Sequence, residues 1–525
     1  MGGGSPLGRT MTSTYSPTTL VTLSTSVPGL LATSFGYDAQ GRLTSAATGG
    51  RTTGITYNAK GFIDTVTLPD AKSIHYTYDD AGRIKTKLLP GNITVGFNYD
   101  PNGNLITLTN PKGVSYAFDY TGVNLRKTMT MPLSGAYTYT YDKERNLKSV
   151  LFPSGKRIDL TYALGLLSST ASPEGTTGYS YACGRNVSGI ARGSETLSYT
   201  YDGNLLTQDV RSGLLNQTIG YGYNNDFNVT SLTYAGSSQS YGYDADGLLT
   251  SAGPFTINRN ALNGLPESLS DGAVTVARSF SGYGELDGVS YAFEFSTPYS
   301  YALTRDGAGR ITRKQETVSG ATDTYDYAYD DAGRLTGVTK NSSLVESYSY
   351  DANGNRQTEI NALRGVNRSY SVSLEDHVIT AGNASYQFDV DGFLTQKTLG
   401  ASTTAYQYSS RGELLSALLP GGPAITYDQD PVGRRIAKRV NGAITEKYLW
   451  QGDTKLLAVY DGSNNLSMRF TYADERMPLA MTYSGATYYL FYDQIGSLRA
   501  VSDASGSISV KKKLTSAADP HNLTL

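Results

Sequence analysis

The chain has 525 residues, and its composition excludes several classes of protein. It contains 58 Gly and 42 Tyr, and only 17% of its residues are charged. This composition is typical of strands and tight turns, and it argues against a coiled coil or a helical solenoid. The 44 basic and 46 acidic residues are interspersed, so no basic stripe of the kind found in nucleic-acid binders is present.

Cysteine and histidine limit the chemistry further. The single Cys183 excludes an internal disulfide. The three histidines lie far apart in the chain, without paired cysteines or a His-Glu-x-x-His motif: His75, His377 and His521. A zinc site is therefore disfavoured, and we expect no metal and no cofactor.

Neither a transmembrane span nor a signal peptide is evident. The longest apolar runs are a few residues, whereas a membrane-spanning helix needs about 20. The first residues, MGGGSPLG, lack the basic and apolar regions of a secretory signal. We interpret residues 1–10 as a flexible leader, so export would depend on something other than a cleaved N-terminal signal.

Taken in chain order, the predicted elements are copies of one short pattern. Residues 35–44 read FGYDAQGRLT, residues 76–86 read YTYDDAGRIKT, and residues 327–336 read YAYDDAGRLT. The aromatic before the Asp recurs at a mean step of 20.6 residues between Tyr37 and Tyr243. The full set of markers is Tyr37, Tyr57, Tyr78, Tyr99, Phe118, Tyr141, Tyr162, Tyr181, Tyr201, Tyr223, Tyr243, Tyr329, Tyr350, Phe388, Tyr408 and Tyr427.

The pattern predicts a β-hairpin for each copy. Tyr-x-Tyr places both rings on one face of a strand, because strand side chains alternate. The Asp opens a turn by accepting a backbone N–H two residues on, and Gly three residues later supplies a positive φ. Stacked hairpins give an all-β fold, a long antiparallel ribbon with strands of about 6–8 residues. Residues 251–300 and 357–382 fit the period poorly. Each of these segments can be interpreted as a plug, a loop or a degenerate repeat.

The length of this ribbon limits what it can enclose. About 25 units give about 50 strands and a ribbon ~240 Å long. A single turn would be ~75 Å across but only ~25 Å tall, which does not seal a volume. A tighter spiral makes a narrower tube or a small capsule. We therefore expect a compact shell, or an incomplete one that needs a partner chain or a missing C-terminal part.

These repeats resemble the YD repeat of the Rhs family, which includes bacterial Rhs polymorphic toxins, shell subunits of Tc toxin complexes and the teneurin barrel. The resemblance covers about residues 30–505. TYDQDPVGRRIAKRVNG at 426–442 and YYLFYDQIGSLRAVSDASG at 488–506 resemble two further segments of that family. It implies a hollow shell or barrel formed by the spiralling ribbon.

The resemblance also implies a division of the chain. We expect a flexible leader and N-terminal cap at 1–30, a YD-repeat shell at 31–440, an Rhs-core-like segment at 441–506 and a tail at 507–525. In the family's toxins an aspartyl-type self-cleavage after this segment releases a C-terminal passenger. Asp493 and Asp503 lie in the matched segment, but no cleavage core follows Gly506, so we expect no autoprotease. The Asp519-Pro520 pair is interpreted as part of the tail.

Acidic residues are the most obvious catalytic or metal candidates. The recurring Asp has a fixed place before x-x-Gly, which favours a turn-capping role. Asp244 with Asp246, and Asp389 with Asp391, begin like calcium loops. A calcium loop needs an acidic residue at its twelfth position, so calcium is disfavoured. The residues at those positions are Phe255 and Gly400.

Three other features have a functional and a structural interpretation. His377, beside Glu375 and Asp376, is a candidate general base, but a packed or loop histidine is favoured. Cys183 lies at the Asp position of a worn repeat and is expected to be buried rather than nucleophilic. The tyrosines are expected to pack and to hydrogen-bond through their hydroxyls, although exposed ones suit sugars or an unfolded chain. We therefore predict no catalytic, cofactor-binding or metal-ligating residue.

The leading hypothesis is a non-enzymatic shell that encapsulates or scaffolds a toxin or effector polypeptide, secreted or delivered outside the cell. Its partner would be that passenger or a second shell subunit. One alternative is a surface adhesin that binds carbohydrate, although such repeats are rich in Trp and this chain has only Trp450. Another is a self-cleaving core that lacks its C-terminal part.

Overall fold

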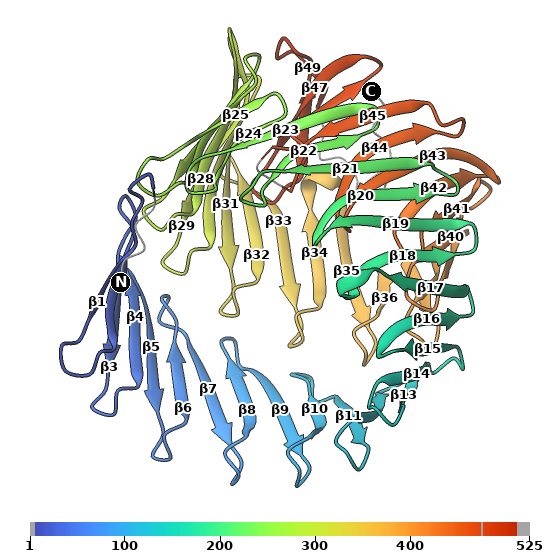
Figure 1. Cartoon of the computed structure of the whole chain (residues 1–525). Coiled ribbons are helices and arrows are strands. Elements are labelled where there is room, and N and C mark those ends of the chain that lie inside the picture. The colour runs from blue at the N-terminus through green and yellow to red at the C-terminus, as the bar shows by residue number, and fades with distance from the viewer. Residues whose placement is uncertain (1–5, 474–475, 512–525) are drawn as a thin grey trace.

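The computed structural model describes residues 6–473 and 476–511 (Figure 1). These residues form one 49-stranded sheet in which each strand pairs antiparallel with the next in the sequence. The predicted antiparallel ribbon is thereby confirmed. The first 23 strands are β1 Thr12–Tyr15, β2 Thr22–Ser26, β3 Thr33–Tyr37, β4 Leu43–Thr48, β5 Arg51–Tyr57, β6 Ile63–Thr67, β7 Ser73–Tyr78, β8 Ile84–Leu89, β9 Ile93–Tyr99, β10 Leu105–Thr109, β11 Ser115–Tyr120, β12 Arg126–Met131, β13 Gly135–Tyr141, β14 Leu147–Leu151, β15 Arg157–Ala163, β16 Leu166–Ser172, β17 Gly175–Tyr181, β18 Val187–Arg192, β19 Glu195–Asp202, β20 Leu205–Ser212, β21 Gln217–Tyr223, β22 Val229–Tyr234 and β23 Ser237–Tyr243.

The second half of the chain continues the ribbon. Its strands are β24 Leu249–Ala252, β25 Phe255–Arg259, β26 Pro266–Ser270, β27 Thr275–Phe280, β28 Leu286–Phe293, β29 Ser296–Arg305, β30 Ile311–Val318, β31 Ala321–Tyr329, β32 Leu335–Lys340, β33 Ser343–Tyr350, β34 Arg356–Asn361, β35 Val366–Val372, β36 Val378–Ala381, β37 Ala384–Phe388, β38 Leu394–Leu399, β39 Ser402–Tyr408, β40 Leu414–Leu418, β41 Ala424–Gln429, β42 Arg435–Val440, β43 Ala443–Gln451, β44 Lys455–Asp461, β45 Leu466–Thr471, β46 Ala480–Tyr483, β47 Ala486–Tyr492, β48 Leu498–Ser502 and β49 Ile508–Lys511. Among the described residues the helices are two 3-10 turns, η1 Cys183–Arg185 and η2 Ala362–Arg364, and neither has the length or the apolar character to cross a membrane.

The poorly phased segments are hairpins of the same ribbon. Residues 251–300 hold β25–β28 and parts of β24 and β29, all paired in order. Residues 357–382 hold most of β34, β35 and β36. Strands also lie inside the predicted N-terminal cap and the predicted tail, where β1, β2 and β49 extend the ribbon. The four-part division of the chain stays a prediction.

The Asp of each repeat caps its turn, as predicted. In the turn after β3, Asp38 Oδ1 accepts the backbone N–H groups of Gln40 and Arg42, and Asp38 Oδ2 accepts the Arg42 guanidinium at 2.7 Å. Gly41 has a φ of 76°, which closes a three-residue loop with a bulge. The same Asp-to-Arg bond recurs in the pairs Asp79–Arg83, Asp306–Arg310, Asp330–Arg334 and Asp430–Arg434.

The tyrosine before each turn ties a hairpin to its predecessor. Tyr57 donates its hydroxyl to the carbonyl of Leu43, the first residue of β4, at 2.8 Å. We call this place, at or near the end of the strand that enters the turn, the anchor position. Equivalent bonds of 2.7–3.1 Å come from Tyr37, Tyr78, Tyr120, Tyr141, Tyr162, Tyr181, Tyr201, Tyr223, Tyr243, Tyr329, Tyr350 and Tyr472.

Two of the predicted phase markers are displaced by two residues. In β11 the anchor is Tyr120 rather than Phe118, because the following turn opens at Thr121. In β41 the anchor is Gln429 rather than Tyr427, because that turn opens at Asp430.

Other side chains with a donor replace tyrosine at this position. Gln429 Nε2 bonds to the Leu414 carbonyl at 2.9 Å, and Trp450 Nε1 bonds to the Arg435 carbonyl at 2.7 Å. Arg259 and Arg305 do the same through their guanidinium groups. The anchor bond can therefore be made by any side-chain donor of sufficient reach, and Phe280 and Phe388 show that the position also accepts a ring without a donor.

Cross-strand register gives the ribbon two chemically different faces. The tyrosine face carries apolar and aromatic residues paired directly across neighbouring strands, as in Ile55–Val66, Val66–Ile74, Phe97–Leu108, Leu108–Tyr116, Phe118–Met129, Met129–Tyr137, Tyr139–Val150 and Val150–Ile158. The small-residue face carries Thr, Ser, Gly and Ala, as in Gly54–Thr67, Thr77–Thr86, Thr86–Gly96, Ala117–Thr130 and Thr140–Ser149.

The ribbon coils through just over two turns. Most bonds between successive turns join residues 233 to 242 positions apart, such as Arg51 with Glu285 and Tyr234 with Phe470. A few span more, such as Lys72 with Asp331 at 259 positions. Strand β5 thus meets the turn before β28, 23 strands later. At ~4.8 Å per strand this is a circumference of ~110 Å and a width of ~35 Å, the tighter of the two predicted spirals. Figure 1 shows the blue strands β5–β11 below the yellow strands β31–β35.

Candidate functional site: the shell wall and its seam

The first turn of the ribbon is a wall one sheet thick. Among residues 6–148 no side chain is buried; most of those on the tyrosine face are half-buried. The accessible surface of the chain is 26730 Å², whereas a compact monomer of 56.3 kDa exposes ~18,500 Å². The excess is what an open shell produces, since both faces of its wall contact solvent. The tyrosine face of this wall is a candidate binding surface.

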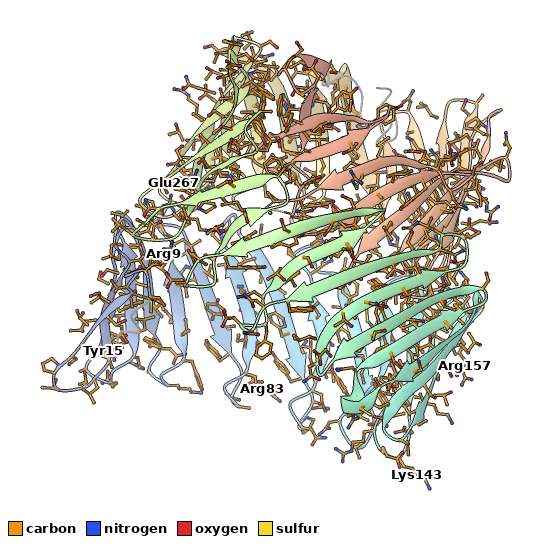
Figure 2. All side chains as sticks on the ribbon, turned by 45° about the horizontal axis from the view of Figure 1, so that its top comes forward. Arg9, Tyr15, Arg83, Lys143, Arg157 and Glu267 are labelled. Carbon is orange, nitrogen blue, oxygen red and sulfur yellow. The ribbon has the colours of Figure 1, made fainter. Side chains whose placement is uncertain are left out.

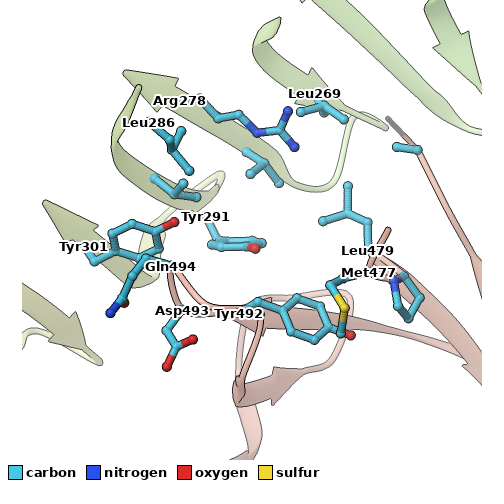
Figure 3. A pocket seen from close by; sticks show the side chains of 15 residues that line it. Leu269, Arg278, Leu286, Tyr291, Tyr301, Met477, Leu479, Tyr492, Asp493 and Gln494 are labelled. Atoms are coloured by element: carbon cyan, nitrogen blue, oxygen red, sulfur yellow. The ribbon is translucent and has the colours of Figure 1, made fainter. Parts of the chain in front are cut away.

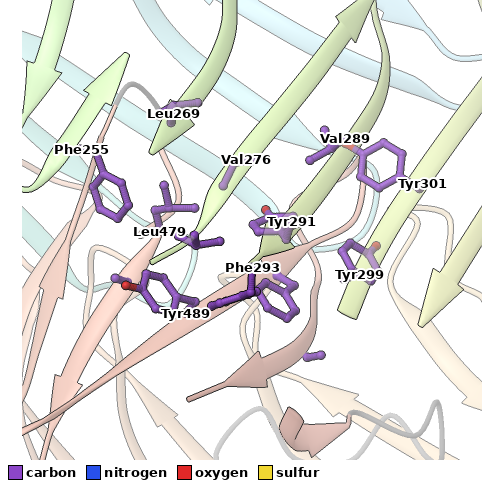
Figure 4. Close-up of a cluster of buried hydrophobic side chains, with 14 of the residues drawn as sticks. Phe255, Leu269, Val276, Val289, Tyr291, Phe293, Tyr299, Tyr301, Leu479 and Tyr489 are labelled. Atoms are coloured by element: carbon purple, nitrogen blue, oxygen red, sulfur yellow. The ribbon is translucent and has the colours of Figure 1, made fainter. Parts of the chain in front are cut away.

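Among the described residues, the tyrosine face packs under a second layer where the ribbon meets its own C-terminal strands. Phe255, Leu269, Val276, Tyr291 and Tyr299 of β25–β29 pack against β46–β48 (Figure 4). The central contact is Phe491 of β47, whose ring centroid lies 4.6 Å from that of Tyr291 and 6.0 Å from that of Tyr299.

In the covering strands the small-residue face differs from that of the first turn, because it carries aromatic side chains. Their positions on that face carry Tyr489 and Phe491 in β47, where Thr or Ser stands in the first turn. A second cluster has the same construction: Ile219 and Leu232 pack against Leu449 of β43 and its neighbours in β44. The closure of the shell is therefore a two-layer apolar core.

The seam between the two turns is made of charged and polar bonds. Glu375, in the turn after β35, accepts the backbone N–H groups of Leu133 at 2.7 Å and Ser134 at 2.8 Å, and also the Ser134 hydroxyl. Burial raises the pKa of Glu375, but these donors outweigh it and hold the pKa below its ordinary value. The turns of the second coil thus cap the turns of the first.

Several carboxylates along the seam have this role. Asp391 accepts the Ser154 backbone N–H at 2.9 Å, and Glu174 of the first coil accepts that of Ser410 at 2.8 Å. At the N-terminal end, Arg51 forms two bonds to Glu285 at 2.8 and 3.0 Å.

The acidic pairs that begin like calcium loops also have partners in the chain. Arg9 reaches Asp244 at 2.7 Å and Asp246 at 3.0 Å, and Figure 2 shows it where the first strands meet β23–β26. Asp389 caps its own turn, while Asp391 lies in the seam.

A buried cluster of charges joins the C-terminal layer to β30. Glu316 is 2% exposed, and its carboxylate binds Arg499 of β48 at 2.6 Å, Tyr299 at 2.9 Å and Lys314 at 3.3 Å. Burial and then the Glu316 carboxylate raise the pKa of Tyr299, and burial lowers the pKa of Lys314. Composition and repeat pattern do not indicate this cluster. Its signal is the alternation of Lys314 and Glu316 on the tyrosine face of β30.

The remaining candidates lie in turns. His377 stacks on Phe388 at 4.6 Å, and its ring lies 4.0 Å from Glu375. Asp493 and Asp503 each cap a turn through backbone N–H groups. Among the described residues no group of three or more His, Cys, Asp or Glu side chains forms a metal site. Asp519, Pro520 and His521 lie outside the described residues.

The prediction that Cys183 is buried at an Asp position is wrong. Ala182 occupies that position, since its N–H bonds to the Asn186 carbonyl and its carbonyl accepts the Arg185 N–H. Cys183 is the next residue of the turn, and it is exposed. Trp450, which the adhesin hypothesis would place on a binding surface, is an anchor residue.

Parts of this sequence are similar to known proteins. The chain is 27% identical over 256 residues to teneurin-3 of Mus musculus, and 28% identical over 197 residues to the tRNA3(Ser)-specific nuclease WapA of Bacillus spizizenii. These matches cover 46% and 37% of this chain but only 9% and 8% of the relatives. The matched part of the chain therefore spans less than a tenth of the length of these curated relatives.

Solved structures share the fold. A Tc holotoxin pore of Photorhabdus luminescens with a mutated TccC3 matches 91% of this chain and 30% of its own, with a TM-score of 0.73 and 13% identity. A TcdB2–TccC3 crystal structure matches the same shares, with a TM-score of 0.67 and 14% identity. The family model described as the teneurin YD-shell matches residues 7–516. This chain, with its coiled ribbon of YD hairpins, belongs to the teneurin YD-shell family.

Proposed function

We propose that this chain forms the wall of a shell that encloses a polypeptide passenger of the toxin or effector class, for delivery outside the producing cell. The observation that carries the proposal is the uncovered tyrosine face of the first turn. It is a strip of mostly half-buried apolar and aromatic side chains, interrupted by Lys87 and bounded by seams that hold the wall closed. Such a strip suits the apolar segments of a chain that has not folded.

The role we propose is mechanical rather than catalytic. The carboxylates of the repeats cap turns or seams, and Asp493 and Asp503 do so in the segment nearest the C-terminus. Similarity to part of a Tc holotoxin and to part of WapA, whose name denotes a nuclease, supports a passenger of the toxin or effector class. A second shell subunit is the other partner we propose, since the matched structures are about three times longer than the part that this chain covers.

The proposal is tested by protection from protease. We would fuse an unfolded reporter segment to the C-terminus and digest the full chain with trypsin. We expect the fused segment to survive while the same segment alone is degraded. The matched control is the same fusion with Glu375→Ala and Asp391→Ala, which opens the seam and should expose the segment. Equal digestion of the fused and free segments would contradict enclosure.

A self-cleaving core makes a different prediction. It predicts that the 56.3 kDa chain shortens near its C-terminus on incubation, and that Asp503→Asn abolishes the break. Our proposal predicts an intact chain, which mass spectrometry of the incubated protein checks directly.

A further inference from the structure

The tyrosine face has few carboxylates where no second layer covers it. We call the open sector the strands β3–β18 and β31–β42, which lie outside the buried apolar clusters. In β3–β18 the direct cross-strand pairs of the tyrosine face include no Asp or Glu. The first coil therefore offers no carboxylate from these pairs to balance a cation on this face.

The carboxylates on this face of β31–β42 already have partners. They are Asp323, Glu346 and Glu359. Asp323 binds Lys340 at 2.7 Å, and Glu359 binds Arg368 at 2.8 Å. Glu346 accepts a tyrosine hydroxyl at 2.6 Å and an asparagine amide at 3.0 Å. None of the three is left to neutralise a further cation.

Four cations on the open sector of the same face have no such partner. Among the described residues they form no ion pair within 4.0 Å and donate no hydrogen bond. They are Lys87 of β8, Arg126 of β12, Lys397 of β38 and Arg435 of β42. This part of the face thus has an excess of positive charge, although the whole chain has a net charge of −2.

Aromatic rings hold these cations on the tyrosine face. The Arg435 guanidinium lies 3.7 Å from the centroid of the Tyr427 ring, and the Arg126 guanidinium lies 5.2 Å from that of Phe118. The two lysines, in β8 and β38, stand directly opposite tyrosines of the neighbouring strands. A ring attracts a cation weakly and carries no net charge, so each cation still lacks a counter-ion from the chain.

The four cations lie on the side of the shell away from the closure. Strand β38 lies over β15, because Ser154 and Asp391 join the turns that precede them, and Arg192 joins the end of β18 to the turn before β42. The cations therefore span the arc from β8 to β19. Arg278 is on the tyrosine face too, but Figure 3 shows it in the closure, at the pocket between β26–β28 and the C-terminal layer.

We propose that the open sector of the tyrosine face binds acidic polypeptide, and that carboxylates of the enclosed passenger pair with these four cations. The assignment rests on the proposed function, in which the passenger contacts this face. A passenger with Asp and Glu among its apolar residues supplies the missing counter-charges, whereas a basic one is repelled. A neutral passenger would bury the cations without a partner, which is also unfavourable.

The spacing of the cations favours a polypeptide over other anions. Within each coil the two cations are four strands, or ~19 Å, apart. One small anion cannot bridge that distance, whereas about six extended residues span it. A nucleic acid carries a phosphate every ~3.4 Å along each strand, and cations so far apart would neutralise few of them.

The test compares two unfolded reporters of equal length and apolar content, whose charged positions are all Glu in one and all Lys in the other. Each is fused to the C-terminus of the full chain and digested with proteinase K, and protection is expressed relative to the same reporter alone. We expect about tenfold greater protection of the Glu reporter, because four weak ion pairs act together, and a smaller difference in ~0.5 M salt. Equal protection of both reporters would overturn the proposal and leave enclosure intact.

Two fourfold variants locate the effect. The first should abolish the preference for the Glu reporter, and it combines Lys87→Gln, Arg126→Gln, Lys397→Gln and Arg435→Gln. The matched control makes the same change in net charge at exposed cations of turns and the small-residue face, and should keep the preference. It combines Lys60→Gln, Lys143→Gln, Arg145→Gln and Arg157→Gln. Equal effects of the two variants, with folding verified by thermal melting, would also overturn the proposal.

Failure of enclosure gives a different result. If neither reporter is protected, enclosure is refuted and the tyrosine face is open to solution. Fluorescence anisotropy of the free labelled reporters with the full chain then tests the charge of this face, and we expect about tenfold tighter binding of the Glu reporter. Equal affinities, or tighter binding of a single-stranded oligonucleotide of the same charge, would contradict the assignment to acidic polypeptide.

Discussion

Strands β3–β16 and strands β25–β29 are built from hairpins of the same kind, but they are stabilised differently. The first group has one layer, and its order comes from capped turns, anchor bonds and the seam. The second group buries its tyrosine face under β46–β48, with Tyr299 and Phe491 fully buried. The difference teaches that a YD hairpin needs no covering layer to be ordered, and that a covering layer is added only where the shell closes.

Low pH should produce the largest difference in stability between the two regions. The Arg83 backbone N–H and the Arg83 guanidinium lower the pKa of Asp79, and equivalent bonds lower the pKa of Asp38. Groups with a lowered pKa stabilise the fold above the ordinary carboxyl pKa near 4, and the stabilisation is lost as pH falls through the folded value. We expect pepsin at pH 2.5 to cleave residues 33–172 well before residues 440–502. Simultaneous cleavage of both regions would show that the apolar core gives no added protection.

Removing the central ring of the closure should produce the largest effect of a single substitution. Phe491→Ala leaves a cavity beside Tyr291 and Tyr299, at a cost of about 3–5 kcal/mol of unfolding free energy. Phe97→Ala, on the half-buried tyrosine face of β9, is the matched control, and we expect about 1 kcal/mol. Hydrogen exchange of the flanking strands measures both, and equal losses would remove the distinction between the two regions.

The buried charge cluster should be nearly as sensitive. Glu316→Gln leaves Lys314 and Arg499 without a counter-charge, and breaking a buried pair in this way costs about 3 kcal/mol. Asp159→Asn removes the exposed pair with Arg157 and should cost under about 1 kcal/mol. Chemical denaturation followed by the exchange of β48 amides distinguishes them. A small effect of Glu316→Gln would mean that this cluster does not hold the C-terminal layer.

The seam should respond locally. Glu375→Gln weakens the acceptor for the Leu133 and Ser134 N–H groups, at a cost of about 2 kcal/mol. Exchange of these two amides should accelerate, while amides in the closure stay unchanged. Glu144→Gln, at an exposed position of the turn after β13, is the control. Unchanged exchange at Leu133 and Ser134 would contradict the role of Glu375.

The anchor bond should give the smallest effect. Tyr57→Phe removes one hydroxyl bond to the Leu43 carbonyl, which contributes about 1 kcal/mol. Tyr76→Phe, whose ring shares the tyrosine face, should cost only a few tenths of this amount. Thermal melts of the two variants compare them, and an equal shift would mean that the phenol acts through packing alone.

The hairpins could be predicted because all their determinants are local. Asp38, Gly41 and the anchor Tyr37 lie within five residues of one another, and their turn chemistry follows from the residue types. The seam could not be predicted, because Glu375 and Leu133 are 242 residues apart and meet only after the coil radius is set. The displaced marker at Phe118 has a different, local cause. The sequence FDYTG offers two places at which the turn can open, and only the structure shows that it opens at Thr121.

The buried charge cluster could not be predicted from the sequence, for another reason. Lys314 and Glu316 look like surface residues of an ordinary strand, and nothing near them in the sequence indicates that β48 covers them. Cys183 was misplaced by one residue because this turn has no Asp, and its Gly184 lies two rather than three residues after Ala182, which opens the turn.

The similar separation of most seam partners has a consequence for how such a chain can change in length. Turns of the second coil dock on particular turns of the first, which in four of these bonds lie 233 to 242 residues earlier. Loss or duplication of a single hairpin between them would shift every later turn by one docking place. Chain length in this region is therefore coupled to the circumference of the shell, and a change is tolerated only together with a compensating one in the neighbouring coil.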